Sequence, residues 1–364
     1  MSLYSSLRIR GPNYFPTIST LRRLGSKTHK KTLIHAIKYT NLLDQRGPVS
    51  TQCVELALTT RSRLYTIDVS FIPNRKELTQ VPHKIVSKSQ LAENIFTADI
   101  EAPLIARARK PGQFVIVIIS NEYSERIPLT IADADPQQGT IRLIWQRIGK
   151  TTAELADMKV GDELAAVAGP LGKPTHIKNF GTVVCVSGGI GSAPMLPIAR
   201  ALKKAPNKII TILGARTKDL LVLEDDFAHT SDELIITTDD GSYGRKALVT
   251  EPLKELCQRN PKPDQVLAIG PAIMMKYCCE VTKKFNIPIQ VSLNTIMVDG
   301  TGMCGGCRIE YDGQPKFVCV DGPEFDGHKV NFDLMIKRLD AYKNQEQKAH
   351  RLYEKQRCKI GLDK

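Results

Sequence analysis

Residues 182–194 read Thr-Val-Val-Cys-Val-Ser-Gly-Gly-Ile-Gly-Ser-Ala-Pro, and this stretch decides the fold of the central part of the chain. A run of β-branched and apolar residues without polar alternation is typical of a parallel strand that is covered on both faces. The glycines that follow allow a tight turn in which backbone N–H groups approach a phosphate closely. A helical pattern then runs from Met195 to Lys203. The stretch therefore predicts a strand, a phosphate-binding loop and a helix, the usual opening of a doubly wound sheet.

The rest of this region alternates in the same way. We expect further strands and helices at residues 208–213, 233–238, 246–257, 265–269, 271–285 and 288–293. Because alternating strands and helices form a parallel sheet, residues 179–294 are expected to fold as one α/β domain. Loop residues at the carboxyl ends of its strands would line a dinucleotide crevice: Gly188, Gly189, Gly191, Arg216, Asp239, Gly270 and Pro271.

The glycine loop departs from the common dinucleotide fingerprint. Its spacing is Gly189-x-Gly191-x-x-Pro194, with proline where a third glycine is usual. Proline is favourable at the first position of a helix, and we expect Pro194 there. Arg216 and Lys218 stand where a 2′-phosphate could be met, so the choice between NADH and NADPH is left open.

Upstream of this domain the pattern changes to short strands separated by turn residues. They are expected at residues 84–86, 94–100, 114–119, 126–131 and 139–145. Many short strands at this spacing predict a small antiparallel barrel of six strands over residues 83–178.

One strand of the barrel carries a flavin-type signature, Arg126-Ile127-Pro128-Leu129-Thr130. Residues four apart on a strand face the same side, so the Arg126 guanidinium and the Thr130 hydroxyl are expected together. A guanidinium suits a pyrophosphate, and a hydroxyl can donate to a flavin ring nitrogen. Gly149, Lys150, Thr151 and Thr152 open a helical pattern that would offer N–H groups to the phosphates. Taken alone, an arginine and a threonine at this spacing more often indicate a solvated strand arginine, and the helix start that follows is what favours the flavin interpretation.

The sharpest signal is a group of possible metal ligands, Asp299, Cys304, Cys307 and Cys319. Their spacing, D-x4-C-x2-C-x11-C, is that of a plant-type two-iron loop with aspartate in the first ligand position. Intervening glycines at 300, 302, 305 and 306 would let the backbone wrap a cluster. A zinc site, a thiol–disulfide pair and chance clustering are the alternatives that spacing alone leaves open.

The chain has 364 residues and a net charge of +13, and the charge is unevenly placed. Residues 1–43 contain eight Lys and Arg and no acidic residue, so the remaining 321 residues carry only +5. This distribution argues against a basic surface for nucleic acid along the whole chain. The longest apolar runs are also too short to span a membrane. We interpret residues 1–82 as a disordered basic extension that is either an organellar transit peptide or a leader without an address.

Barrel, nucleotide sheet and cluster segment follow one another in the order of an electron-transfer series. This order resembles the ferredoxin-NADP reductase superfamily, and more closely the small (alpha) subunits of NADH-dependent reduced ferredoxin:NADP oxidoreductases, also named sulfide dehydrogenase beta subunits. The residues that carry the resemblance are 125–132, 149–152, 169–174, 214–216, 238–244, 297–305 and 320–328.

The resemblance implies FAD on the barrel, NAD(H) on the sheet and a [2Fe-2S] cluster on Asp299, Cys304, Cys307 and Cys319 of a segment spanning 295–332. A helical tail at 333–364 would complete the chain. The resemblance also implies a heterodimer with a large glutamate-synthase-like subunit that holds a second FAD and four-iron clusters, bifurcates electrons and meets ferredoxin. The compartment would be the cytoplasm, or the matrix of a mitochondrion-like organelle if the extension is a transit peptide.

Two other functions are weighed against this one. The electron-transfer subunit of an NAD-dependent dihydroorotate dehydrogenase shares the architecture, but cysteine would be expected there at position 299. A non-catalytic nucleotide-binding subunit would predict a broken phosphate loop or a missing cluster loop, and the sequence shows neither.

Overall fold

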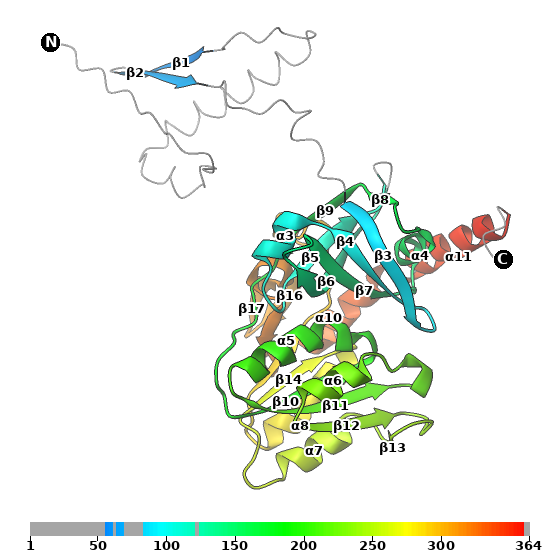
Figure 1. Cartoon of the computed structure of the whole chain (residues 1–364). Coiled ribbons are helices and arrows are strands. Elements are labelled where there is room, and N and C mark those ends of the chain that lie inside the picture. The colour runs from blue at the N-terminus through cyan, green and yellow to red at the C-terminus, as the bar shows by residue number, and fades with distance from the viewer. Residues whose placement is uncertain (1–54, 61–62, 69–82, 121–123, 360–364) are drawn as a thin grey trace. The chain divides into compact units, whose positions relative to one another are not determined.

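The computed structural model describes residues 55–60, 63–68, 83–120 and 124–359 (Figure 1). The chain divides into two compact units, Met1–Leu78 and Thr79–Lys364. In the first unit an antiparallel hairpin joins β1 (Glu55–Thr60) to β2 (Arg63–Asp68). All remaining elements belong to the second unit.

The hairpin is a departure from the expected extension without regular structure. Apolar residues alternate at positions 56 and 58 and again at 65 and 67, a period of two that is typical of strands. The register pairs Leu56 with Ile67 and Leu58 with Tyr65. The rest of the expected extension, and with it the transit-peptide hypothesis, lies outside the described residues.

The second unit begins with an antiparallel sheet that curls into a nearly closed barrel, in the order β8-β3-β4-β7-β6-β5-β9. The two edge strands, β8 and β9, are separated only by Ala165, so one bent segment of chain serves both edges and closes the barrel. The expected six-stranded barrel is confirmed, with its last strand divided at Ala165. The strands are β3 (His83–Ala92), β4 (Ile95–Glu101), β5 (Phe114–Ile118), β6 (Arg126–Asp135), β7 (Thr140–Gln146), β8 (Glu163–Leu164) and β9 (Ala166–Leu171).

Two short helices complete the barrel. The sequence analysis did not predict α3 (Pro103–Ala108), whereas α4 (Lys150–Asp157) begins within the stretch where a helix start was expected. Trp145 is buried in the barrel core and donates its indole N–H to the carbonyl of Thr152 at 3.2 Å, which ties β7 to α4.

The expected parallel sheet is also confirmed, in the order β13-β12-β11-β10-β14-β15-β18. The two apolar clusters on its faces show that α5 and α6 cover one face and α7 and α8 the other. The elements are β10 (Thr182–Gly188), α5 (Ser192–Lys204), β11 (Lys208–Ala215), α6 (Glu224–Thr230), β12 (Glu233–Thr238), β13 (Arg245–Lys246), α7 (Thr250–Cys257), β14 (Gln265–Ile269), α8 (Ala272–Lys284), β15 (Ile289–Ser292) and β18 (Glu324–Asp326). The strand order reverses between β10 and β14. In such sheets ligands bind at the carboxyl ends of the strands where the order reverses.

The prediction for Pro194 is wrong by two positions. Residues 189–191 form a 3-10 turn, η1 (Gly189–Gly191), that continues directly into α5, so the helix begins at Ser192. Pro194 is therefore the third residue of the helix. It still lies in the first turn, where a missing N–H removes no helical hydrogen bond.

The cluster segment joins the sheet through its last strand. After the hairpin of β16 (Arg308–Tyr311) and β17 (Gln314–Phe317) and the short helix α9 (Val318–Asp321), β18 pairs antiparallel with β15. Neither β18 nor β13 was predicted, and the helix expected from Lys246 begins only at Thr250 because Lys246 belongs to β13. The 3-10 turn η3 (Gly327–Lys329) leads to α10 (Phe332–Leu339), η4 (Asp340–Tyr342) and α11 (Lys343–Lys359), which form the expected helical tail. No helix in the described ranges is long and apolar enough to cross a membrane.

One apolar core joins all three parts of this unit. It contains Phe114 and Ile116 of β5, residues on one face of the sheet, and Cys307 and Cys319 of the cluster segment. The barrel strand, the nucleotide sheet and two of the predicted ligands are therefore held by the same packing.

A carboxyl group lies at the junction of these parts. Glu324 of β18 accepts a hydrogen bond from the Thr175 hydroxyl, and the Thr175 N–H donates to Pro111 of the barrel at 2.9 Å. Burial raises the pKa of the Glu324 carboxyl to about 7. The hydrogen bond from Thr175 lowers this pKa, but by less than burial raises it. Because the pKa in the folded state exceeds that in the unfolded state, folding is favoured by protonation of Glu324. Its contribution is complete below about pH 4.5 and is lost as the pH rises through 7.

We therefore expect Glu324→Gln, which cannot ionise, to stabilise the protein relative to the unchanged chain as the pH rises. The pKa shift corresponds to about 3 kcal/mol at 1.36 kcal/mol per unit. Melting temperatures at pH 5 and pH 8 measure this, and the gap between variant and unchanged chain should widen by several degrees. The exposed Glu280→Gln is the control and should show a constant gap. An equally constant gap for Glu324→Gln would contradict the assignment.

Candidate functional site

The predicted flavin strand is paired on one side only. Residues Arg126 to Thr130 of β6 pair with β5, but pairing of β6 with β7 begins at Ile131. On the β7 side, peptide groups of this half-strand have no strand partner among the described residues. They can therefore bond a planar ligand through backbone N–H and C=O groups.

Side chains alternate along this half-strand as expected. Ile127 and Leu129 pack against the barrel core, so Arg126, Pro128 and Thr130 point to the outside of the barrel. Arg126 is exposed and Thr130 half-buried. Leu129 was predicted to contact the cofactor, and its inward side chain leaves only its backbone for that contact.

The start of α4 lies beside this half-strand. The Thr151 hydroxyl donates to Glu125 Oε2, which directly precedes Arg126. Gly149 is the N-cap of α4, and its N–H donates to Thr152 Oγ1 at 3.0 Å. The first turn of a helix leaves N–H groups without helical acceptors, so those of Lys150 and Thr151 can bind anions.

The guanidinium of Arg126, the unpaired edge of β6 and the N-terminus of α4 therefore lie on one surface. This donor set fits a flavin dinucleotide, with the diphosphate at Arg126 and α4 and the ring along the half-strand. The sequence analysis gave no role to Glu125. Its position next to Arg126 was visible, but its bond to Thr151 depends on the tertiary fold.

The glycine loop lies at the strand-order reversal between β10 and β14. A Cβ added to Gly191 would lie 2.3 Å from the carbonyl oxygen of Ile269, so only glycine allows this close approach to the end of β14. Gly189 has φ +54° and open space around it, which leaves room for a ligand. The loop therefore fits the dinucleotide crevice that the sequence predicted.

Two polar side chains at this loop are buried without a partner. Ser187 and Ser192 flank the glycines, and their hydroxyls have no hydrogen bond within the described residues. Such orphaned groups are rare in folded proteins and mark places where a ligand or water belongs. Neither serine was predicted as a site residue, although both lie within the stretch 182–194 that predicts the phosphate-binding loop.

The other predicted nucleotide residues lie at the same edge. Arg216 and Asp239 are exposed in the loops after β11 and β12, and Gly270 and Pro271 follow β14. The Asp239 N–H donates to Ala215 at 3.1 Å, which ties the two outer loops together. These four residues therefore line one edge of the sheet, as expected from its topology.

The four predicted metal ligands form two pairs. Cys304 Sγ lies 3.5 Å from Asp299 Oδ1, and Cys307 Sγ lies 3.2 Å from Cys319 Sγ. Two thiolates bound at about 2.3 Å to one tetrahedral metal would lie about 3.7 Å apart, so each pair has the spacing of two ligands on one ion. Cys304 is exposed, whereas Cys307 and Cys319 are each 1% exposed.

This arrangement suits two metal ions better than one. In the described part of the chain, no three His, Cys, Asp or Glu side chains converge on a single-ion site. Backbone N–H groups also point at sulfur, from Gly306 to Cys304 and from Cys319 to Cys307, both at 3.4 Å. The donor set and its pairing fit a [2Fe-2S] cluster and argue against the zinc alternative.

Asp299 is held in place by the loop itself. Its carboxylate accepts hydrogen bonds from the backbone N–H groups of Thr301 at 3.0 Å and Cys304 at 3.1 Å. These hydrogen bonds lower the pKa of the Asp299 carboxyl, and the one from the Thr301 N–H has the largest effect. The predicted ligand position is therefore filled by a carboxylate that the loop orients and keeps ionised.

The cluster loop packs directly on the barrel. Gly300 has φ +74°, and a Cβ there would lie 2.7 Å from Leu171 Cδ1 and 2.8 Å from Ile116 Cγ1. Ile116 pairs in register with Pro128 of the flavin half-strand. The loop that carries Asp299 is thus one strand away from the predicted flavin surface.

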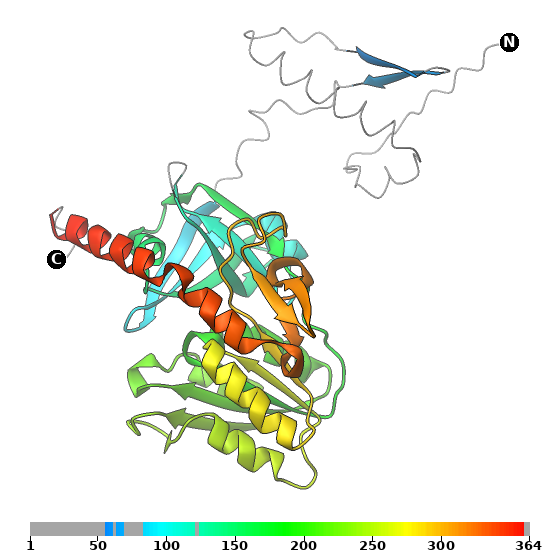
Figure 2. The same cartoon turned by 180° about the vertical axis from the view of Figure 1, so that it is seen from behind.

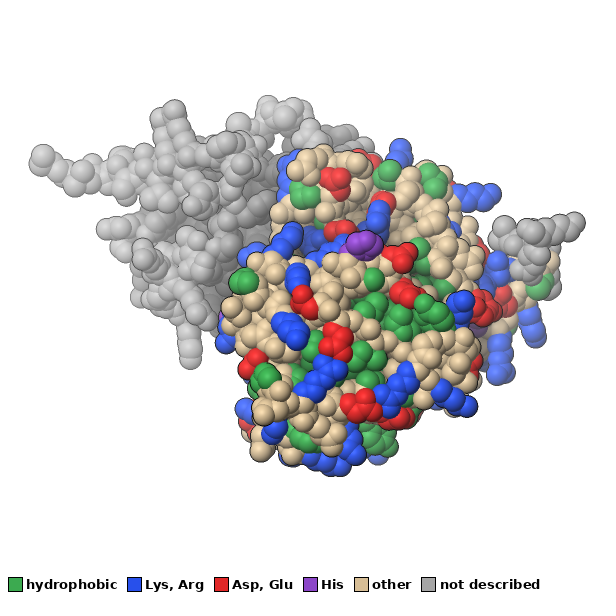
Figure 3. Space-filling model, turned by 60° about the horizontal axis from the view of Figure 1, so that its bottom comes forward, with side chains coloured by type: hydrophobic (Ala, Val, Ile, Leu, Met, Phe, Trp, Pro, Cys, Tyr) green, Lys and Arg blue, Asp and Glu red, His purple; other side chains and the backbone are tan. Residues whose placement is uncertain are grey.

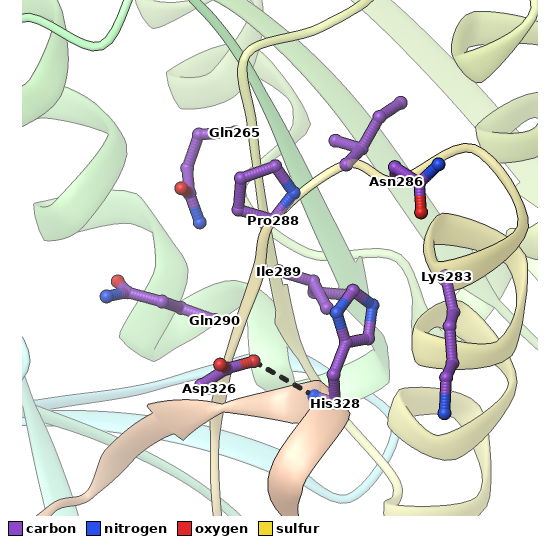
Figure 4. A pocket seen from close by; sticks show the side chains of 9 residues that line it. Gln265, Lys283, Asn286, Pro288, Ile289, Gln290, Asp326 and His328 are labelled. Atoms are coloured by element: carbon purple, nitrogen blue, oxygen red, sulfur yellow. Dashed lines mark hydrogen bonds between the residues drawn. The ribbon is translucent and has the colours of Figure 1, made fainter.

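A hollow of about 580 Å³ lies elsewhere, near the amino ends of β14 and β15 (Figure 4). Its lining is mostly amide and apolar, with Lys283, Asp326 and His328 as the charged or titratable groups. The His328 ring is bonded to Thr282 Oγ1 at 2.9 Å. None of the predicted site residues lines this hollow, and ligands of parallel sheets bind at the other edge.

Comparisons with known proteins agree with this geometry. The profile of the family described as "Iron-sulfur cluster binding domain of dihydroorotate dehydrogenase B" matches residues 294–331. A relative from Thermotoga maritima, "Dihydroorotate dehydrogenase B (NAD(+)), electron transfer subunit homolog", is 49% identical over 273 residues, covering 75% of this chain and 96% of the relative. The "Dihydroorotate dehydrogenase B (NAD(+)), electron transfer subunit" of Clostridium perfringens is 34% identical over 252 residues, covering 68% and 97%.

A solved structure is similar over the same share of this chain. It is a chain of the NADH-dependent reduced ferredoxin-NADP oxidoreductase, described for its insights into flavin-based electron bifurcation. The two chains are 47% identical and superpose with a TM-score of 0.71, covering 75% of this chain and 98% of the other.

Replacing Arg126 by alanine should weaken FAD binding at least about tenfold, because a charge-assisted fork to the diphosphate is lost. Flavin content after purification and a fluorescence titration with FAD measure this. Arg107→Ala removes another exposed arginine of the barrel and should leave FAD binding unchanged. A full flavin content in purified Arg126→Ala would show that Arg126 is only a solvated side chain.

Changes at Asp299 test the fourth ligand. Asp299→Cys should keep the two-iron absorption but alter the EPR signal or the midpoint potential, because a thiolate replaces an oxygen ligand. Asp299→Ala should lower bound iron and sulfide by more than half, while the exposed Asp219→Ala retains them. Spectra and potential of Asp299→Cys that match the unchanged chain would refute ligation by Asp299.

Proposed function

The chain belongs to the family of dihydroorotate dehydrogenase B electron transfer subunits and their homologues, within the ferredoxin-NADP reductase superfamily, and we propose that it passes electrons between NAD(H) and a larger flavoprotein subunit. It is an oxidoreductase subunit of the flavin, iron–sulfur and NAD type. The observation that carries the proposal is the contact of Gly300 with Ile116, which joins the cluster loop to the strand beside the flavin surface.

The residues of the chain have separate tasks in this function. FAD held here would supply the exchange of one hydride, and so of two electrons, with NADH, and a two-iron cluster would pass those electrons on one at a time. Arg126 and the N-terminus of α4 would hold the diphosphate, and the Thr130 hydroxyl would act as a donor to the flavin ring. We assign Thr130 the one catalytic position, because it stands on the flavin side of the barrel and its hydroxyl has no bond within the described residues.

The nicotinamide cofactor has its own surface on the sheet. Gly188, Gly189 and Gly191 bring backbone N–H groups to its pyrophosphate, and Gly270 and Pro271 form the opposite side of the crevice. Ala193 of α5 packs with Ala132 of β6 and Ile144 of β7. This contact places the glycine loop beside the barrel, so that a nicotinamide and a flavin can meet.

The exposed side of the cluster loop supports electron exchange with a partner. Met303 is 88% exposed beside the exposed ligand Cys304, and Val298 and Val320 next to the loop are 48% and 39% exposed. Val320 lies against Gly302 and Val298 against Gly306 of this loop, and exposed apolar side chains that gather at one loop favour an interaction site. An electron acceptor that docks here would reach the cluster without crossing the protein.

We infer that the partner is the large subunit of an NADH-dependent ferredoxin:NADP oxidoreductase. Two observations favour it. The solved chain at 47% identity comes from such an enzyme. Asp299 occupies the first ligand position, where a dihydroorotate dehydrogenase subunit would carry cysteine. That partner would be glutamate-synthase-like, hold a second FAD and four-iron clusters, and reduce ferredoxin, so that this chain meets ferredoxin only indirectly.

The second candidate is an NAD-dependent dihydroorotate dehydrogenase, whose name several relatives carry. Such a subunit shares the architecture, but cysteine would be expected there at position 299 in place of Asp299. A basic surface along the whole chain is not favoured, because residues 44–364 carry a net charge of only +5. On the face in Figure 3, Lys and Arg are interspersed with Asp and Glu. The non-catalytic alternative has no support, because both phosphate-binding loops and the ligand pairs are intact.

Localisation follows from the extension rather than from the fold. We propose an organellar matrix if residues 1–82 act as a transit peptide, and the cytoplasm otherwise. A fusion of these residues to a fluorescent protein distinguishes the two. A diffuse cytosolic signal would remove the organellar proposal without affecting the electron-transfer function.

Purification at native stoichiometry tests the partner. We expect the chain to copurify one to one with a larger subunit that contains FAD and four-iron clusters, and the complex to reduce ferredoxin and NAD⁺ together with NADPH as donor. Mass spectrometry identifies the subunit, and cofactor analysis and coupled assays measure its content and activity. Copurification with a subunit that oxidises dihydroorotate would instead establish the second candidate.

A further inference from the structure

The C-terminal helix α11 has one face bound to the barrel. Tyr353 Oη donates to Asp157 Oδ2 at 2.8 Å, and Arg357 Nε lies 2.6 Å from the same carboxylate at the end of α4. Glu354 pairs with Arg147 at 2.6 Å, just ahead of the α4 N-cap. This face is tied to the helix that the flavin diphosphate would use.

The opposite face of α11 has no partner among the described residues. Its side chains recur every three or four positions, so they form one stripe about 16 Å long. All are exposed and border one hollow along the helix: Asn344, Gln347, Lys348, Arg351, Leu352 and Lys355. The stripe contains three cations and no acid, and Leu352 in its middle is 53% exposed.

This helix lies on the same face of the unit as the cluster segment (Figure 2). The link is α10, whose Arg338 donates to the carbonyl of Gly306 in the cluster loop at 3.2 Å. From there the chain continues through η4 into α11. A large partner that docks at the cluster loop and extends along α10 would therefore reach α11.

We propose that the Lys348–Arg351–Lys355 stripe of α11 is a docking surface for an acidic helical segment of the larger partner subunit. This inference rests on the proposed function, since it names the surface that the partner uses in addition to the cluster loop. Carboxylates spaced at three and four residues on a partner helix would match the three cations. The amide side chains and Leu352 would supply the uncharged part of the contact.

Other occupants fit the stripe less well. Residues 1–43 of the chain itself carry eight basic residues and no acid, so they would be repelled. A membrane surface would need a broad apolar face, and the stripe offers only Leu352. Nucleic acid would need a longer basic track than three side chains on one helix.

The test is a triple charge reversal, Lys348→Glu, Arg351→Glu and Lys355→Glu, in the full chain with its cofactors. We expect its affinity for the copurified larger subunit to fall at least about tenfold at physiological salt. Raising the salt should weaken binding of the unchanged chain more than that of the variant. The matched control reverses three exposed lysines elsewhere, Lys204→Glu, Lys254→Glu and Lys283→Glu, and should bind normally.

Two further measurements make the result specific. NADH oxidation with an artificial acceptor should be the same in all three proteins, because the stripe touches neither nucleotide nor flavin. Unchanged affinity of the triple variant would overturn this inference and leave the proposed function intact. If the unchanged chain itself does not bind the larger subunit, both fail. Loss of binding to anionic vesicles or duplex DNA, with subunit binding retained, would assign the stripe to those ligands instead and also overturn it.

Discussion

The packing of Phe114 and Ile116 against the sheet and the cluster segment is the contact on which the rest of the unit depends. Both residues belong to a barrel strand, yet their side chains leave the barrel and enter the core that also buries Cys307 and Cys319. Because interiors are close-packed, this shared core prevents the three parts from shifting independently. Flavin surface, nucleotide crevice and cluster loop therefore keep their mutual positions, as electron transfer among them requires.

The site uses backbone that the fold leaves unpaired. One half of β6 completes the barrel with β7, and the other half keeps a free edge. Polar groups are also left without a partner in the described part of the chain at the glycine loop, where these are the hydroxyls of Ser187 and Ser192. At the start of α4 the first N–H groups have no helical acceptor. Unpaired polar groups destabilise an empty fold, so cofactor binding should stabilise the holoprotein considerably. Helix α4 itself is held at both ends. Glu125 accepts a hydrogen bond from Thr151 at its start, and Tyr353 and Arg357 contact Asp157 at its end.

Local patterns in the sequence predicted most of the framework. The strands at 233–238 and 265–269 agree with β12 and β14 to the residue, because unbroken apolar runs between turn residues leave little choice. The cluster pairs follow from spacing in a glycine-rich loop. Long-range contacts were missed: the pairing of β18 with β15, the contact of Gly300 with Ile116 and the bond of Glu125 to Thr151 join residues distant in sequence or depend on tertiary packing. Leu129 was placed in the site by its motif, whereas alternation along the strand turns its side chain inward.

The central claim is that this one chain connects a nicotinamide, a flavin and a two-iron cluster. The most direct measurement is an anaerobic titration of the purified holoprotein, without any partner, with NADH, followed by flavin absorbance and low-temperature EPR. The account predicts that the flavin bleaches and a reduced two-iron signal appears in the same protein. Flavin bleaching without a cluster signal, in protein whose iron and sulfide are complete, would contradict it.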